Sequence, residues 1–212
     1  MKNRLSSFIV STDLKACVAS LRPALIAVVL MAAFFGQGDR MVATAMKILP
    51  PYFADAAAVT SLIVQPVFLL PACLLLSVAA RIRSGGLKLS RLGLFAFSSG
   101  GVALIVSLVL KHAIGRARPD VSLNLDPFIV RPFAFDDAYA SFPSAQSACA
   151  AAVLIGAGMI VPRWQRPLHI CAVMLCGARV LTGEHWVSDA VAGWAIGWLS
   201  VMALSRLAPS RG

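Results

Sequence analysis

Five polar side chains lie near the ends of apolar runs in this 212-residue sequence, and their chemistry indicates phosphoryl transfer. Lys111, Arg118 and Arg179 supply cations, because an arginine fork matches phosphate oxygens and a lysine adds a point charge. His185 and Asp189 are four residues apart, so they share one face of a helix. A carboxylate in that place can fix the tautomer of an imidazole. The set therefore predicts transfer through a histidine nucleophile.

Ser144 adds a further group that could contact an anion. It follows Pro143 at the expected start of a helix, where free N–H groups and the dipole favour negative charge. Each feature also has a simpler interpretation: interfacial cations, a helix N-cap at Ser144, and a structural pair of His185 with Asp189. Their joint occurrence in this order favours the functional interpretation.

The elements that must position these side chains are membrane helices. The sequence is 59% hydrophobic and only 13% charged, whereas soluble domains carry about 25% charged residues. This composition excludes a disordered chain and a nucleic-acid partner. Six charge-free runs predict an all-α, six-span membrane bundle and a single domain over residues 1–212. Three of them, residues 56–80, 92–110 and 144–161, are long enough to cross a bilayer, and the other three reach that length only with flanking residues. The runs are residues 24–36, 56–80, 92–110, 144–161, 168–178 and 190–205.

The charges of the six-span arrangement are distributed asymmetrically. The net charge is +10, and one side of the bilayer holds twelve cations and one acid, against seven cations and eight acids on the other. The positive-inside rule then predicts cytoplasmic termini, a cytoplasmic (inner) membrane and a site at the outer, periplasmic side. Residues 1–22 are expected to be cytoplasmic or interfacial. Residues 41–54 are expected along the outer surface, and residues 112–142 as an outer loop.

The polar groups resemble the three-part signature of the type-2 phosphatidic acid phosphatase and haloperoxidase superfamily, over about residues 92–205. Its first part, K-x6-R-P, is present in full, and the third, S-R-x5-H-x3-D, differs only by Ala178 in place of Ser. The second, P-S-G-H, is present as Pro143 and Ser144, followed by Ala145 and Gln146. The resemblance covers about half of the chain, and its membrane branch has a six-span fold.

The resemblance implies a role for each matching residue. His185 would form a phosphohistidine, and Asp189 would orient it. Phosphate would be bound by Lys111, Arg118, Ser144 and Arg179. No metal or other cofactor is expected, since vanadate belongs to the soluble haloperoxidase branch. The partners would be membrane lipids and a lipid phosphate or diphosphate substrate.

Gln146 is the departure with chemical consequences, because the histidine usual at that position protonates the leaving group. An amide donates a hydrogen bond but delivers no proton. General acid catalysis is worth about 10²–10⁴-fold, and its loss is felt least with a good leaving group. The substitution is therefore consistent with an enzyme for a lipid diphosphate or a phosphotransferase, or with a substitute acid such as His112 or Glu184. It is also consistent with a weak or inactive relative that binds a lipid phosphate.

The sequence also bears on a transporter function and on the oligomeric state. A transporter is disfavoured, because residues 56–80 and 92–110 carry few polar side chains. Small residues at 98–101, and at Gly193 and Gly197, could pack helices within one chain or in a homo-oligomer.

Overall fold

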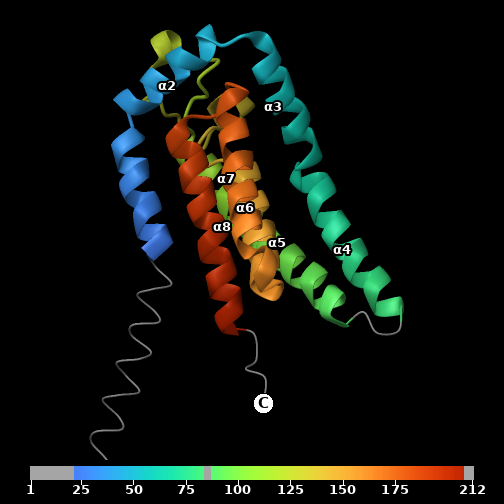
Figure 1. Ribbon diagram of the computed structural model, residues 1–212. Helices are drawn as coiled ribbons and strands as arrows, with labels where there is room; N and C mark the ends of the chain where they lie inside the picture. Colours follow the sequence, from blue (N-terminus) through green and yellow to red (C-terminus); the bar gives the residue numbers. More distant parts are fainter. Residues whose placement is uncertain (1–21, 84–86, 208–212) are drawn as a thin grey trace, which may run out of the picture.

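The computed structural model describes residues 22–83 and 87–207, and these form helices joined by short turns and one long connection (Figure 1). Predictions that fall on residues 1–21 lie outside the described part. The helix Arg22–Phe34 comes first. It is followed by α2 (Gln37–Ile48), α3 (Pro51–Ile63), α4 (Pro66–Ile82), α5 (Leu87–Ile114), α6 (Ala145–Ile160), α7 (Gln165–Leu181) and α8 (Val187–Leu207), with short 3-10 helices at Leu123–Leu125, Asp137–Tyr139 and Pro162–Trp164.

Helix α6 occupies the centre of the bundle and packs against α5, α7 and α8. Small residues make this possible: Ala148, Ala151 and Ala152 of α6 are fully buried. On α8, a Cβ added at Gly193 would lie 2.4 Å from the Ser144 carbonyl oxygen, and one at Gly197 2.6 Å from that of Ala148. The two glycines therefore serve packing within one chain.

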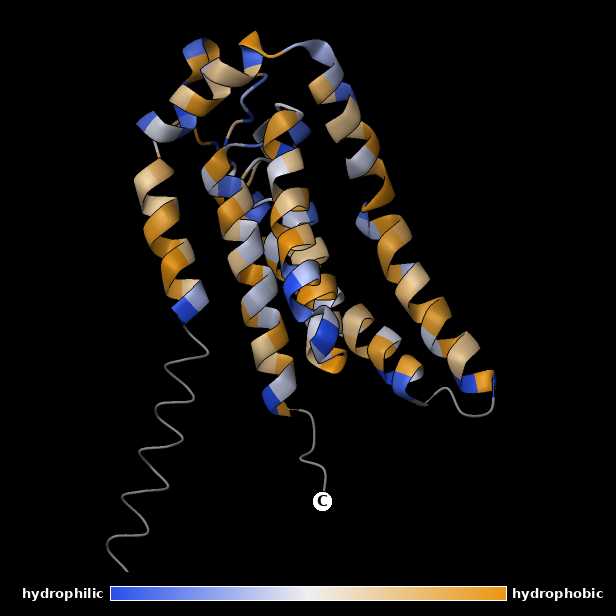
Figure 2. Cartoon of the chain, in the orientation of Figure 1, coloured by the Kyte–Doolittle hydropathy of each residue, from blue (hydrophilic) through white to orange (hydrophobic). Residues whose placement is uncertain are grey.

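The expected all-α membrane architecture is confirmed. Helix α8 and residues Lys88–Ile114 of α5 are each long and apolar enough to cross a bilayer. Figure 2 shows long hydrophobic stretches along α4 and along the helix Arg22–Phe34. Large apolar side chains such as Leu75 and Ile105 face outward, as a lipid environment requires.

The apolar runs predicted from the sequence do not all correspond to single continuous helices. Residues 56–80 do not form one helix: α3 ends at Ile63, α4 begins at Pro66, and the pair is bent by 41°. Pro66 explains the break, because it has no N–H and disfavours the helical conformation of Gln65. The helix Arg22–Phe34 and α2 are bent by 74°. By length and composition the described residues hold two candidate spans, or four if each bent pair is one span, and the count of six stays a prediction.

The direction of the helices brings four helix ends together. The end of α5, the start of α6, the end of α7 and the start of α8 all lie at the end of the bundle that α2 crosses (Figure 1). Residues 41–54 form most of α2 and the start of α3 there, separated by Leu49 and Pro50. The long connection from Gly115 to Ser144 folds over the same end, with a short antiparallel bridge between Arg116 and Val130. Gly115 has φ +64°, and a Cβ there would collide with the Arg131 carbonyl oxygen.

Candidate active site

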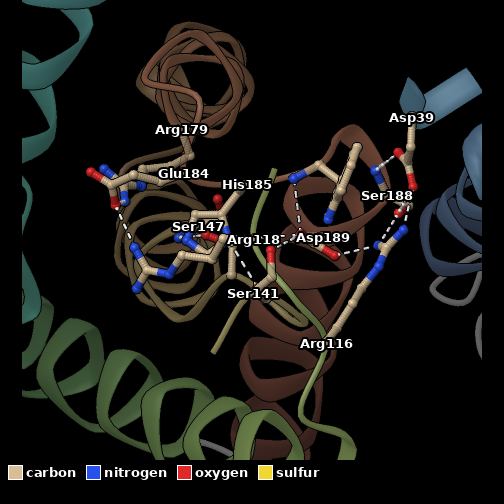
Figure 3. A network of polar contacts seen from close by, with 12 residues as sticks. Asp39, Arg116, Arg118, Ser141, Ser147, Arg179, Glu184, His185, Ser188 and Asp189 are labelled. Carbon is tan, nitrogen blue, oxygen red and sulfur yellow. Dashed lines mark hydrogen bonds and ion pairs between the residues drawn. The ribbon is translucent and has the colours of Figure 1, made fainter. Parts of the chain in front are cut away.

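The residues predicted for the site converge at this end of the bundle, and Figure 3 shows Arg118, Arg179, His185 and Asp189 close together. The Ser144 N–H donates to the Asp189 carbonyl oxygen at 3.1 Å, and Lys111 is near enough to feel the charges of Arg118 and Arg179. Ser144, His185, Arg179 and Asp189 are all less than 5% exposed. Lys111 lies in the last turn of α5 and Arg179 in the last turn of α7. Arg118 belongs to the long connection, and Ser144 is the N-cap of α6. His185 lies in the turn before α8, and Asp189 lies in the first turn of that helix.

The ring of His185 is fixed by the main chain. Its Nδ1 atom lies 2.9 Å from the carbonyl oxygen of Ser141 and 3.8 Å from Oδ2 of Asp189. A carbonyl only accepts, so Nδ1 carries the proton, and Nε2 of the neutral ring keeps its lone pair. Ser141 was not singled out in the sequence, where nothing marks a backbone carbonyl as an orienting group.

Asp189 acts on this arrangement through its neighbours. Its Oδ2 accepts from the Ser141 hydroxyl at 2.5 Å and from the Trp186 N–H at 2.9 Å. The carboxylate therefore holds both the residue whose carbonyl contacts His185 and the backbone immediately after His185. Orientation of His185 by Asp189 stays a prediction, and these two contacts, together with the 3.8 Å approach of Oδ2 to Nδ1, are the means by which Asp189 could provide it.

Two arginines converge on one carboxylate oxygen. Oε2 of Glu184 accepts from Nη1 of Arg118 at 3.3 Å and from Nη2 of Arg179. Burial raises the pKa of Glu184, but the charge and hydrogen bond of Arg179, with Arg118, outweigh it and hold the pKa below its ordinary value. Glu184 is thus a carboxylate in the free protein and occupies the guanidinium groups expected to bind phosphate.

Each of the two arginines also has a buried donor without a partner in the part of the chain that the structure describes. The Nε atoms of Arg118 and Arg179 are buried and make no hydrogen bond within the described part of the chain. The same is true of Oε1 of Gln146, in the first turn of α6. Buried donors without acceptors are rare in native proteins. Two guanidinium groups that share one carboxylate oxygen and still have unused N–H donors fit an oxyanion such as a phosphoryl group.

Ser144 and His112 have local roles in the fold. The Ser144 hydroxyl caps α6 by accepting from the Ser147 N–H at 3.4 Å. His112 packs on the ring of Phe135, and its Nδ1 lies 3.2 Å from the Ala134 carbonyl oxygen. Contacts to phosphate by Ser144 and proton donation by His112 remain predictions.

Two charged residues next to the site, Arg116 and Asp39, were not predicted from the sequence. Arg116 and Asp39 are each 1% exposed. Nη1 of Arg116 lies 2.6 Å from Oδ1 of Asp189, and Nη2 lies 2.7 Å from Oδ2 of Asp39 (Figure 3). Arg116 stands inside the first signature part, between Lys111 and Arg118, and its position there was the available signal. Asp39 had no comparable signal, because its partners are up to 149 residues away along the chain.

Comparison with known proteins shows the family of the chain and agrees with its architecture. The sequence model described as the PAP2 superfamily matches residues 92–212, and the chain belongs to this superfamily. A lipid A 1-phosphatase of Rhizobium etli is 35% identical over 124 residues, which is 58% of this chain and 53% of that protein. An undecaprenyl-diphosphatase of Sulfolobus acidocaldarius is 29% identical over 113 residues, 49% of this chain and 53% of that protein.

The chain thus spans about half the length of the curated relatives it matches. A solved structure shares its fold over nearly the whole length. The crystal structure of a transmembrane PAP2-type phosphatidylglycerolphosphate phosphatase from Bacillus subtilis has a TM-score of 0.64 and 21% identity, and the match covers 91% of this chain and 98% of that one.

Proposed function

We propose that the protein is a membrane phosphatase that hydrolyses a lipid-linked phosphate or diphosphate through a phosphohistidine at His185. One observation carries the proposal. The neutral imidazole has a fixed Nδ1–H and an Nε2 lone pair, in a buried site with two guanidinium groups whose Nε–H donors have no partner among the residues that the structure describes. The names of the relatives, a lipid A 1-phosphatase and an undecaprenyl-diphosphatase, support a lipid phosphate as the substrate class.

The reaction takes two steps. Lys111, Arg118 and Arg179 bind the phosphoryl oxygens, and Nε2 of His185 forms a bond to phosphorus as the bond to the leaving oxygen breaks. Water then attacks phosphorus, the N–P bond breaks, and inorganic phosphate is released. In the first step Asp189 keeps His185 oriented through Ser141 and supports the positive charge that develops on the ring.

Gln146 directs the choice of substrate. No imidazole is present at this position to protonate the leaving oxygen, so a leaving group that is stable as an anion is favoured. The leaving phosphate of a diphosphate meets this need, since the second pKa of a phosphate group is about 6. A lipid diphosphate such as a polyprenyl diphosphate is therefore the preferred substrate, and it would be hydrolysed at the outer, periplasmic face of the inner membrane.

Phosphate release from purified protein tests the proposal. The panel contains polyprenyl diphosphate, phosphatidic acid, phosphatidylglycerol phosphate and lipid A. We expect release from polyprenyl diphosphate to exceed release from phosphatidic acid, and His185→Ala to abolish both. Equal rates on the two lipids would contradict the diphosphate preference.

Gln146 and Ala178 also favour a second candidate, a relative that binds a lipid phosphate without hydrolysing it. This candidate predicts saturable binding of polyprenyl diphosphate with no phosphate release and no phosphohistidine.

A further inference from the structure

We infer that Asp39 and Arg116 are positioning residues, which hold Asp189, and through it His185, in the arrangement that the proposed reaction uses. The inference rests on the proposed function for its kinetic consequences and on the described contacts for its geometry. It assigns to α2, far from the signature in sequence, a direct connection to the site.

Arg116 donates hydrogen bonds from all three nitrogen atoms of its guanidinium group. Nε donates to the Pro127 carbonyl oxygen at 2.9 Å, and Nη1 donates to the Ser188 hydroxyl at 2.7 Å and to Asp189 at 2.6 Å. Nη2 donates to Asp39 at 2.7 Å. The same guanidinium lies over the aromatic ring of Trp186 at 5.3 Å. A buried cation with this number of fixed partners has one orientation available.

Both carboxylate oxygens of Asp39 accept hydrogen bonds. Its Oδ1 accepts from the Ser188 N–H at 2.9 Å, and its Oδ2 accepts from the Ser188 hydroxyl at 2.5 Å and from Arg116. Ser188 lies in the first turn of α8, whose N–H groups have no partner within the helix. Asp39 therefore binds the start of α8 from a different segment and places negative charge at the positive end of that helix.

The two oxygens of the Asp189 carboxylate have different partners. Arg116 takes Oδ1, which leaves Oδ2 for the Ser141 hydroxyl and the Trp186 N–H. Rotation of the carboxylate would break contacts on both sides. The orientation of Ser141, and so of the Nδ1–H of His185, depends on Arg116 keeping Asp189 in place (Figure 3).

The charges explain why both partners of Arg116 are needed. Asp39, Arg116 and Asp189 form a row of negative, positive and negative side chains with almost no exposure. A buried charge is tolerated when it is paired and hydrogen-bonded. Without Asp39, Arg116 has only Asp189 as a counter-ion, and Nη2 of Arg116 loses its acceptor. The guanidinium group can then move, so Asp189 loses a partner of fixed position.

The kinetic test uses purified full chain and the lipid that the wild type hydrolyses best. We expect Asp39→Asn to lower kcat by about 10²-fold, as small misplacement of reacting groups can, and to change KM less than about threefold, because Asp39 does not contact the phosphate-binding arginines. Asp39→Glu keeps the charge and should recover part of the loss. Arg116→Lys should behave like Asp39→Asn.

Arg40→Gln is the matched control, since Arg40 is on the same helix and donates instead to the Leu125 carbonyl oxygen. Near-normal kcat in Asp39→Asn would overturn the inference, as would an equal loss in Arg40→Gln, which would show a general effect of moving α2.

A second measurement does not need turnover. The chain has three histidines, His112, His169 and His185, so nitrogen NMR of histidine-labelled protein can follow each ring. We expect a single Nδ1–H tautomer at His185 in the wild type and a mixture in Asp39→Asn, with the other two rings unchanged. An unchanged His185 signal in Asp39→Asn would contradict the inference. Absence of phosphate release by the wild type would instead contradict the proposed function. The NMR comparison would then still decide whether Asp39 positions His185.

Discussion

His185 and Ser141 are joined by a hydrogen bond from the imidazole Nδ1–H to a main-chain carbonyl, at 2.9 Å. The bond gives the proposed nucleophile one tautomer and one orientation without using a charged group. The nearest carboxylate, Asp189, contacts the hydroxyl of Ser141 and stands 3.8 Å from the ring nitrogen. The orienting carboxylate and the nucleophile are therefore connected through a third residue, which makes their coupling sensitive to the position of the 141–144 segment.

The pH dependence of the reaction should reflect the burial of His185. Burial disfavours the charged ring, and the nearby Lys111 and Arg179 add repulsion, so the pKa of His185 lies below its ordinary value of 6.5 despite the opposing effect of Asp189. A nucleophilic imidazole is neutral above its pKa, and a lower pKa extends activity toward acid. We expect the acid limb of kcat/KM to lie below pH 6.5. An acid limb above that value, measured with a substrate whose charge is constant in this range, would contradict the assignment.

Glu184 should compete with the phosphoryl group for Arg118 and Arg179. The Glu184→Gln variant removes the negative charge that occupies the two guanidinium groups, so inorganic phosphate should inhibit it at several-fold lower concentration than the wild type. The measurement is competitive inhibition by phosphate. A fall in kcat with unchanged inhibition would contradict competition between Glu184 and phosphate. Asp136→Gln, on the exposed connection, is the control and should leave both quantities unchanged.

Gln146→His should restore protonation of a poor leaving group. We expect kcat on phosphatidic acid to rise by about 10-fold or more, within the range of about 10²–10⁴ that general acid catalysis supplies. The rate on polyprenyl diphosphate should change little, because its leaving phosphate needs less assistance. The Gln146→Asn variant controls for disturbance of the first turn of α6. Equal acceleration of both substrates would show that the missing proton donor does not determine the preference.

Gly193→Ala should destabilise the bundle at the contact between α6 and α8. The new Cβ would lie 2.4 Å from the Ser144 carbonyl oxygen, which belongs to backbone and cannot move aside cheaply. We expect a loss of about 1–3 kcal/mol, as overpacking usually costs, seen as a lower midpoint of thermal unfolding in detergent. Gly101→Ala in α5 is the control, since a Cβ there has no atom within 4 Å, and it should be neutral or stabilising. Equal midpoints for the two variants would contradict the close packing.

The sequence was most informative where spacing and helix ends coincide. The distance from His185 to Asp189 and the ends of the apolar runs predicted one cluster, and the structure assembles it at the meeting of four helix ends. Pro66 is a signal for the break between α3 and α4, but residues 56–80 are charge-free and mostly apolar, so their hydropathy alone predicts one continuous helix. The span count depends on how bent pairs lie in the bilayer, which local sequence does not determine.

The supporting residues were harder to predict for a physical reason. Asp39 acquires its role only when α2 is bent across the bundle and meets the start of α8. Ser141 contributes a carbonyl, which every residue has. Such contacts depend on tertiary structure alone, whereas phosphate-binding cations and a reactive histidine are recognisable by chemical type.

The central claim, transfer through His185, is tested most directly by mapping the phosphorylated residue. Purified protein is mixed with a labelled lipid diphosphate, quenched under alkaline conditions and digested, and the label is located among His112, His169 and His185. We predict acid-labile phosphate on His185 that appears within one turnover and is absent from His185→Ala. Phosphate release that continues in His185→Ala, or label on another histidine, would contradict the account.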